Sequence, residues 1–565
     1  MKAYHAAYQI VGLLAARGLR HVVVSPGSRS APLTLAFARH PQIKTYVVHD
    51  ERSAAYQALG MAQTLRQAVA LVCTSGTAAV NFAPAVVEAF YLEVPLLVLT
   101  ADRPPEWIDQ QDGQAIHQGQ LFAPHVKAAY QLPVSYEHQD ARWHLLRSIN
   151  EAYNEAMRFP YGPVHVNCPF REPLYPAPHE PLTFDDAPRC IEELPAETQT
   201  LSENSWQQLE KLWEAARRPL ILAGQSHSPM PFYEHIEQFC NQLHVPVVHG
   251  RLANYPYHSG LPYPNILPQD LAPDLLISVG GSVLSKPLKL LLRACPPAQH
   301  WHIRPAGKVA DPFRALTHIL RCNEAAFFRE AARRFSPKAK DYRNHIEELA
   351  TAYDAFLQDA FPAKTNELHE LWLTQQLLQQ LPAHALLYVA NSSPVRYVEM
   401  LRSRRDVVVR ANRGTSGIDG CTSTALGAAR VDDRPVFLLT GDIAFFYDSN
   451  AFWEAPHTLN FKVILINNQG GGIFRLIDGP RRQDEGPAFF ETPHQRRAAS
   501  LMAHYGIPCF EVHSTADFES QWEAFVSREG MAVIEVMIDR QLNAHIFEKF
   551  QQSWKEKQPM VSRSH

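Results

Sequence analysis

The sequence predicts an α/β protein with three consecutive α/β domains, each with a mainly parallel sheet flanked by helices. Short apolar runs that end in small or polar residues alternate with helical stretches, which is the pattern of βαβ units. This alternation occurs in three blocks along 565 residues. Because 46% of the residues are hydrophobic and 19% are charged, each block can bury a core. We expect domains at 1–175, 200–345 and 366–555.

The first block opens with an amphipathic helix, since polar residues interrupt its apolar stretch at helical spacing and no cleavage site follows. Helices are expected over Glu51–Leu65 and Gly76–Tyr91, between apolar runs that read as buried strands. The predicted strands of this block are 21–25, 45–50, 68–74 and 95–100.

A segment rich in proline and acidic residues, Glu172–Glu197, is predicted to link the first two blocks. The second block then has three strands, followed by a charged helical stretch over Arg329–Glu348. The third block starts near Asn366 and has five strands. The predicted strands are 219–223, 245–248 and 274–280 in the second block, and 386–390, 406–410, 435–440, 462–467 and 532–537 in the third.

Bulk properties exclude several classes of protein. The formal net charge is -4, whereas a nucleic-acid binder usually has a basic excess. The eight cysteines form no CxxC pair, which argues against a disulfide framework or a zinc site. No run reaches the roughly 18 apolar residues of a membrane span. We therefore expect a cytoplasmic protein.

Polar residues end two consecutive strands of the third block. One strand runs into Gly441 and Asp442, and the next runs into Asn467, Asn468 and a glycine triplet that starts at Gly470. The carboxyl ends of parallel strands lie at one edge of the sheet, where ligands bind. Carboxylate and amide oxygens suit magnesium, and glycines let the backbone approach a diphosphate. Either motif alone is typical of a turn, but the pair on neighbouring strands favours a bound metal and diphosphate.

The pair resembles the thiamine-diphosphate motif, in which a GD pair and a later NN pair close neighbouring strands. This chain departs from the commoner GDG form, because Ile443 is at the third position. The resemblance implies that thiamine diphosphate is held through Mg²⁺, with Mn²⁺ as the alternative ion. The metal ligands would be Asp442, the Asn468 side chain and the Gly470 carbonyl.

Glu51 is the candidate activating acid. It follows a predicted strand and opens a helix of small residues. A carboxyl group that hydrogen-bonds the aminopyrimidine of thiamine diphosphate promotes the imino tautomer, which removes the C2 proton of the thiazolium ring. Position alone favours an acid that stabilises the helix N-terminus, and the thiamine motif shifts the interpretation to catalysis. Related enzymes take this glutamate from the partner subunit, which implies a homo-oligomer with its active site at a dimer interface.

Several strings of the chain closely resemble the family of 2-succinyl-5-enolpyruvyl-6-hydroxy-3-cyclohexene-1-carboxylate synthases of menaquinone biosynthesis. The resemblance is strong in the first and third blocks and weaker in the middle one. It implies cofactor contacts from Glu51, Ser416, Gly417, Ile418, Asp442, Asn468, Gly470, Gly471, Ile473 and Phe474, with Ile418 propping the cofactor in its bent form. The strings are SPGSRSAPLT (25–34), HDER (49–52), TSGTAAVNFAPAVVEA (74–89), LTADRPPE (99–106), NRGTSGIDG (412–420) and NNQGGGIF (467–474).

The family joins 2-oxoglutarate to isochorismate with loss of carbon dioxide. Both substrates are dicarboxylates, and the planar fork of arginine suits carboxylates. The implied substrate-binding residues are Ser28, Arg29, Arg103, Gln114, Lys286, Ser392, Arg396 and Arg413. Gly113, before Gln114, and the Ser393-Pro394 pair, before Arg396, depart from the expected pattern.

Two other interpretations stay open at this point. One is a simple 2-oxo-acid decarboxylase or oxidase, although no His-His pair follows Glu51 and the arginines argue against small neutral substrates. The other is a non-catalytic protein that kept the fold, which would not need Glu51. For Arg396, the alternative is a surface arginine that pairs with Glu399 on the following helix.

Overall fold

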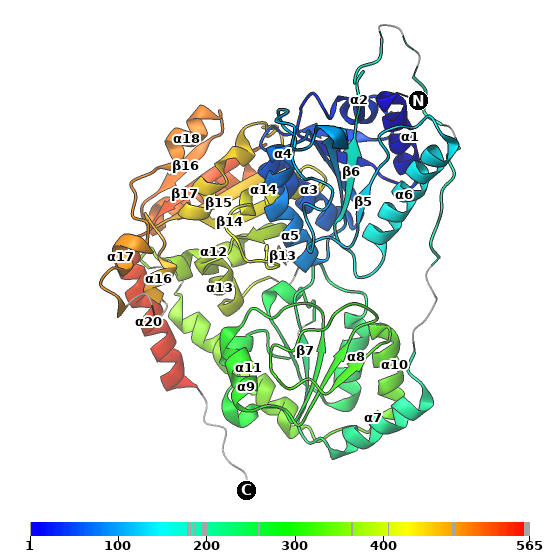
Figure 1. The fold of residues 1–565 in the computed structure, drawn as a ribbon. Coiled ribbons are helices and arrows are strands. Elements are labelled where there is room, and N and C mark those ends of the chain that lie inside the picture. The colour runs from blue at the N-terminus through cyan, green and yellow to red at the C-terminus, as the bar shows by residue number, and fades with distance from the viewer. Residues whose placement is uncertain are drawn as a thin grey trace.

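The computed structural model describes residues 2–177, 180, 182–185, 187–194, 200–257, 260–362, 365–404, 406–476, 479 and 482–558. Three parallel sheets, each flanked by helices, follow one another along the chain, which confirms the predicted fold class (Figure 1). Their strands fall within 21–169, 219–320 and 386–537. Each of the predicted domain ranges contains one of these sheets.

The first sheet has the strand order β2-β1-β3-β4-β6-β5. Both of its faces are covered: Val22 and Val24 pack on the side of α1 and α6, while Val23 packs on the side of α3 and α5. The predicted helix Gly76–Tyr91 is divided into α4 and α5, and β5 and β6 were not predicted. The elements are α1 (Ala3–Ala16), β1 (His21–Val24), α2 (Ala31–Arg39), β2 (Lys44–Val47), α3 (Glu51–Leu65), β3 (Val69–Cys73), α4 (Thr77–Asn81), α5 (Ala83–Leu92), β4 (Leu96–Asp102), β5 (Ala129–Gln131), α6 (Gln139–Met157) and β6 (Val164–Pro169).

The second sheet has the order β11-β10-β9-β7-β8. The single helical stretch expected over Arg329–Glu348 is wrong, because α10 ends at Arg334 and a new helix begins at Asp341. The elements are α7 (Glu203–Ala215), β7 (Pro219–Ala223), α8 (Tyr233–Leu243), β8 (Val247–His249), β9 (Leu275–Val279), α9 (Lys286–Ala294), β10 (Gln299–Ile303), β11 (His318–Leu320), α10 (Glu324–Arg334) and α11 (Asp341–Ala360).

The third sheet has the order β13-β12-β14-β15-β17-β16, which repeats the order of the first sheet strand for strand. The chain therefore carries two doubly wound sheets of the same topology, separated by the middle one. The elements are α12 (Glu370–Gln380), β12 (Leu386–Val389), α13 (Ser393–Met400), β13 (Val408–Arg410), α14 (Cys421–Ala429), β14 (Val436–Gly441), α15 (Asp442–Tyr447), β15 (Phe461–Asn467), α16 (Ile473–Leu476), α17 (Gly486–Phe489), α18 (Ala498–His504), β16 (Cys509–Val512), α19 (Thr515–Ser527), β17 (Ala532–Met537) and α20 (Arg540–Lys557).

The first and third sheets meet through α3 and α14, which lie side by side at the centre of the molecule (Figure 1). Glycines allow this close approach: a Cβ at Gly60 would lie 1.9 Å from the Thr424 carbonyl oxygen, and one at Gly427 would lie 2.1 Å from the Gln57 carbonyl oxygen. The Ser53 and Ser423 hydroxyls are 2.9 Å apart across the same interface. The first and third sheets are thus held in a fixed relation to each other within one chain.

The middle and third sheets share one continuous apolar core. It includes Leu222 of β7, Tyr353 and Phe356 of α11, Leu387 of β12 and Trp554 of α20. Burial of such large side chains stabilises the chain by about 2 kcal/mol each. The middle domain is therefore packed against the third rather than tethered to it.

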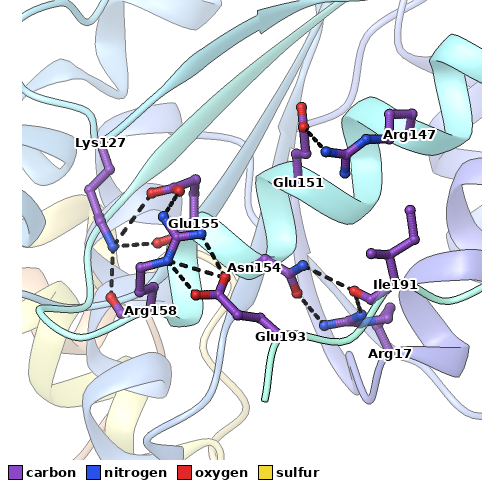
Figure 2. Close-up of polar contacts among 9 residues, drawn as sticks. All are labelled: Arg17, Lys127, Arg147, Glu151, Asn154, Glu155, Arg158, Ile191 and Glu193. Carbon is purple, nitrogen blue, oxygen red and sulfur yellow. Dashed lines mark hydrogen bonds and ion pairs between the residues drawn. The ribbon is translucent and has the colours of Figure 1, made fainter. Parts of the chain in front are cut away.

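The predicted linker Glu172–Glu197 lies partly outside the described residues, and its described end runs along α6. Figure 2 shows Arg17, Asn154 and Arg158 reaching its residues Ile191 and Glu193. The Asn154 amide donates to the Ile191 carbonyl at 3.0 Å, and the Arg158 guanidinium donates to Glu193 at 2.8 and 2.6 Å. This end of the linker is docked on the first domain. No helix in the described part of the chain is long and apolar enough to cross a membrane.

Candidate active site

The residues predicted to bind the metal lie at the adjoining ends of β14 and β15, which pair in parallel with Gly441 opposite Ile466. Asp442 is buried at the start of α15. Its carboxylate accepts hydrogen bonds from the Ile443 amide at 2.7 Å and from the Gly470 amide at 2.9 Å. Gly470 thus turns its amide toward Asp442, and its carbonyl accepts from the Gly472 amide at 3.0 Å.

The Asn468 Oδ1, two residues beyond Ile466 on the neighbouring strand end, is buried and has no hydrogen-bond partner among the described residues. The His494 Nε2 is 3.3 Å from the Asp442 Oδ2. Burial raises the pKa of Asp442 to about 6 against the opposing effect of the Gly470 amide. An unsatisfied buried acceptor next to a buried carboxylate is costly unless a cation joins them. The donor chemistry at this edge therefore fits a hard cation such as Mg²⁺.

A hydrogen bond to Glu370 orients the Asn468 side chain. Its amide nitrogen donates to the buried Glu370 carboxylate at 2.7 Å, which leaves the Oδ1 as its free acceptor. Burial raises the pKa of Glu370 to about 7. The other predicted residues of this loop follow directly: Gly471 donates to the Glu491 carbonyl, Ile473 is buried, and the Phe474 ring is 5.6 Å from that of Phe490.

The loop 412–420 joins β13 to α14 and carries the predicted cofactor residues Ser416, Gly417 and Ile418. Asn391, at the end of β12, holds its inner side by donating to the Asn412 carbonyl at 2.7 Å and to the Gly417 carbonyl at 2.6 Å. Ile418 packs against Ala390, Cys421 and Ala444. Ser416 is exposed and has a φ of 63°, so the loop turns sharply at this point.

Glu51 is the first residue of α3, and Asp50 caps that helix by accepting from the Ser53 amide at 3.2 Å. Its neighbours are bound to the third domain: Asp50 accepts from the Asn450 amide at 2.8 Å, and Arg52 donates to the Tyr447 carbonyl at 3.0 Å. Glu51 itself has no hydrogen bond or ion pair with any described residue. The segment is therefore fixed while its one candidate acid is left available.

The predicted substrate residues of the first domain gather at the carboxyl edge of its sheet. Arg29 is buried and donates to the Phe170 carbonyl at 3.0 Å. Burial and the nearby Arg103 lower the pKa of Arg29. Arg103 donates to the Gly113 carbonyl at 2.8 Å, while Ser28 and Gln114 are exposed at the same edge. Both arginines have carboxylate neighbours, since Arg103 pairs with Asp112 at 2.8 Å and Arg29 lies 3.8 Å from Glu172. An anion bound here would have to replace these carboxylates as the partner of the two arginines.

A second set of cations lies in the third domain. Arg396, on α13, donates to the Ser392 carbonyl, and the Arg413 guanidinium donates to the Asn391 Oδ1 at 2.7 Å. Burial and the nearby Arg396 lower the pKa of Arg413. Arg396 is exposed, as the alternative of a surface arginine has it, but these two described residues, Arg396 and Glu399, form no ion pair, and the Glu399 carboxylate accepts from the Leu252 amide at 3.1 Å instead.

Lys286 lies apart from this set, exposed at the first position of α9. Lys289, one turn further along α9, is the lysine that approaches the third domain: burial and the charge of Arg413 lower its pKa. Within one chain, none of the described residues Glu51, Ser28, Arg29, Arg103 and Gln114 forms a hydrogen bond or ion pair with the predicted cofactor residues of the third domain.

Several residues contact these loops in a way that the sequence does not indicate. Asn391, Glu370 and His494 act on the third-domain loops, and Glu88 of α5 accepts hydrogen bonds from Gly414 and Thr415. Glu88 is part of a string that carried the family resemblance. Its partners, however, lie more than three hundred residues away, so spacing gives no signal for its contact.

Two family models identify the class of protein to which the chain belongs. Residues 4–121 match the family model "Thiamine pyrophosphate enzyme, N-terminal TPP binding domain", and residues 393–536 match "Thiamine pyrophosphate enzyme, C-terminal TPP binding domain". A solved benzoylformate decarboxylase from Polynucleobacter necessarius has a TM-score of 0.69 and 16% identity, covering 96% of this chain and 99% of its own, which supports the fold. The chain is a thiamine-diphosphate enzyme.

The full-length relatives give the family. A 2-succinyl-5-enolpyruvyl-6-hydroxy-3-cyclohexene-1-carboxylate synthase of Cytophaga hutchinsonii is 37% identical, covering 97% of this chain and 98% of its own length. Those of Desulfotalea psychrophila and Porphyromonas gingivalis are each 36% identical, covering 93% and 96% of this chain and 96% of their own lengths. The chain belongs to this family of synthases.

Proposed function

We propose that the protein decarboxylates 2-oxoglutarate and adds the resulting succinyl carbanion to isochorismate, as a step of menaquinone biosynthesis. The main support is at the adjoining ends of β14 and β15, where Asp442 has a buried carboxylate and the Asn468 Oδ1 has no hydrogen-bond partner among the described residues. Membership of the synthase family supplies the substrates. A transferase of this kind needs an anchored cofactor, an acid and two anion sites.

In this proposal, Asp442, the Asn468 Oδ1 and the Gly470 carbonyl hold Mg²⁺ or Mn²⁺ together with the diphosphate. Thiamine diphosphate supplies, when bound, the carbon centre that accepts the electron pair released with carbon dioxide. Ile418 supports the cofactor from its small apolar cluster with Ala390 and Ala444. The protein's own contribution is to position, to exclude water and to hold charge.

Glu51 holds the proton that the aminopyrimidine needs. Its carboxyl group has no described partner, and its flanking residues are fixed to the third domain, so it can meet a ligand without losing an existing bond. The anion sites divide between the domains: Arg396, Ser392 and Arg413 hold the distal carboxylate of 2-oxoglutarate, and Arg29, Arg103, Ser28 and Gln114 hold isochorismate. Lys286 is the weakest member, since it comes from the middle block, where the family resemblance is weaker.

We further propose that the active site lies between two copies of the chain, each giving Glu51 to the cofactor held by the other. Exposed apolar side chains lie on, or against, the segment 47–52 that carries Glu51: Val47 is 49% exposed, Tyr447 54% and Trp453 59%. The Trp453 ring is 5.8 Å from that of His49, and Arg52 stacks on Tyr447. Such aromatic groups are typical of interface cores. A cytoplasmic location accords with eight free cysteines.

The test of the cofactor assignment is Glu51→Gln. The amide cannot pass a proton to the aminopyrimidine, so carbon dioxide release from 2-oxoglutarate should fall by about a hundredfold or more. Exchange of the cofactor C2 proton should slow in parallel, while the melting temperature stays near that of the wild type. A near-normal rate with unchanged C2 exchange would overturn the role of Glu51.

A further inference from the structure

The loop 412–420 is held on its outer side by the first domain of the same chain. The Glu88 carboxylate, on α5, accepts from the Gly414 amide at 2.8 Å, the Thr415 amide at 2.6 Å and the Thr415 hydroxyl at 2.5 Å. At the far end of the loop, the Tyr56 hydroxyl donates to the Asp419 carboxylate at 2.8 Å. Glu88 and Tyr56 of the first domain thus bind the two ends of the segment that carries Ser416, Gly417 and Ile418.

The contact at Glu88 is close and dry. Glu88 is 1% exposed, and a Cβ at Gly414 would lie 2.7 Å from the Glu88 carbonyl oxygen. Burial raises the pKa of Glu88, and the three donors from Gly414 and Thr415 oppose that effect. No cation among the described residues forms an ion pair with Glu88, so loop donors alone satisfy this carboxylate. Three donors that converge on one buried carboxylate are typical of a preorganised position.

We propose that Glu88 is a positioning residue that holds the 412–420 loop of the third domain in the shape that receives thiamine diphosphate. The inference rests on the proposed function, because the cofactor role of the loop belongs to that proposal. Asn391 fixes the inner side of the loop from within the third domain, whereas Glu88 fixes the outer side across the domain boundary. Cofactor binding in the third domain therefore depends on the first domain of the same chain.

The decisive variant is Glu88→Gln. An amide has only one acceptor oxygen, so its NH₂ group would face a loop N–H that the carboxylate now satisfies. The dissociation constant of thiamine diphosphate, measured by calorimetry on cofactor-free protein with magnesium present, should rise about tenfold, as for a buried donor left unpaired. Hydrogen exchange at the Gly414 and Thr415 amides should accelerate.

The matched control is Glu93→Gln at the end of the same helix. Glu93 also crosses a domain boundary, by pairing with Arg304 of the middle domain, and does not touch the loop. Its loss should leave cofactor affinity and exchange at Gly414 unchanged. If Glu88→Gln does not fold, Thr415→Ala removes the hydroxyl from the same carboxylate, and we expect a rise of about threefold in the dissociation constant.

The outcomes separate the two claims. Faster amide exchange or a lower melting temperature in Glu88→Gln, with unchanged cofactor affinity in both this variant and Thr415→Ala, would overturn the inference, because the contact would then be structural only. Failure of the wild-type protein to bind thiamine diphosphate would overturn the proposed function, and this inference with it.

Discussion

Substrate choice rests on single residues, and Arg396 is the one whose surroundings are most informative. It donates to the Ser392 carbonyl, and its charge helps to lower the pKa of the nearby Arg413. A guanidinium bound to a backbone carbonyl exchanges that weak partner readily for a carboxylate, with which it forms charge-assisted hydrogen bonds. Among the described residues no carboxylate forms an ion pair with Arg396, which makes it suitable for recognising an anionic substrate.

We expect Arg396→Ala to raise the Michaelis constant for 2-oxoglutarate about 30-fold, the effect of losing a charge-assisted hydrogen bond of about 2 kcal/mol. Pyruvate lacks the distal carboxylate, so its constant should change little and the preference between the two oxo acids should narrow. Steady-state kinetics with both acids measure this. An unchanged ratio of specificity constants would rule out Arg396 and leave Arg413 as the next candidate.

Contacts between residues at adjoining strand ends could be predicted from the sequence, whereas contacts between distant segments could not. The ends of β14 and β15 were predicted to place Asp442 and Asn468 together, and they are neighbours because consecutive strands with parallel pairing share an edge. The contact of Glu88 with Gly414 could not be predicted, since it joins domains through the tertiary fold. Lys286 was a candidate from the less similar middle block, whereas Lys289 is the lysine of α9 whose pKa the charge of Arg413 lowers.

At the scale of elements, the packing of α3 on α14 controls the relation between Glu51 and the third domain. Each helix presents a glycine to the backbone of the other, so the helices approach more closely than side chains would permit. Glu51 opens α3, and the loop 412–420 leads directly into α14. A shift of one helix along the other would therefore displace both halves of the proposed site.

Gly60→Ala should lower the free energy of unfolding by about 1–3 kcal/mol, the usual cost of overpacking, because its Cβ would meet the Thr424 carbonyl. Denaturant unfolding monitored by fluorescence measures the change. Gly113→Ala is the matched control, since no atom lies within 4 Å of a Cβ at that position. Equal stabilities for the two variants would contradict the close helix contact.

The elements also reveal which patterns identify a strand. The helix Glu51–Leu65 was predicted with its observed bounds, because an acid opens it and its face of small residues is continuous. By contrast, β10 was missed because its sequence, QHWHI, alternates polar and aromatic residues, and β5 was missed because it is three residues long and lies at the sheet edge. Apolar runs identify most of the buried strands, whereas short strands and strands interrupted by polar residues give a weaker signal.

At the scale of the whole molecule, two sheets of identical strand order face each other within one chain, and the proposed cofactor site needs an edge from each. Within the described chain, the predicted residues of the first domain form no hydrogen bond or ion pair with those of the third. A second copy, placed on the apolar patch of Val47, Tyr447 and Trp453, would bring the missing half. A two-fold arrangement of this kind forms two equivalent sites.

Mixing two inactive variants tests this arrangement. Glu51→Gln and Asp442→Ala should each be inactive alone, the second through loss of metal-dependent cofactor binding. When they are unfolded and refolded together in equal amounts, half of the dimers carry one intact site, so activity should recover to about a quarter of the wild-type rate. No recovery, with mixed dimers demonstrated by mass spectrometry, would place Glu51 and Asp442 of one chain in the same site.

The central claim is that the protein forms a carbon–carbon bond between two dicarboxylates. The most direct measurement is a mass spectrum of the products after pure protein is incubated with thiamine diphosphate, magnesium, 2-oxoglutarate and isochorismate. We predict an adduct whose mass equals the sum of both substrates less carbon dioxide, formed only when isochorismate is present. Release of carbon dioxide at the same rate without isochorismate, with no adduct when it is present, would contradict the account and identify a simple decarboxylase.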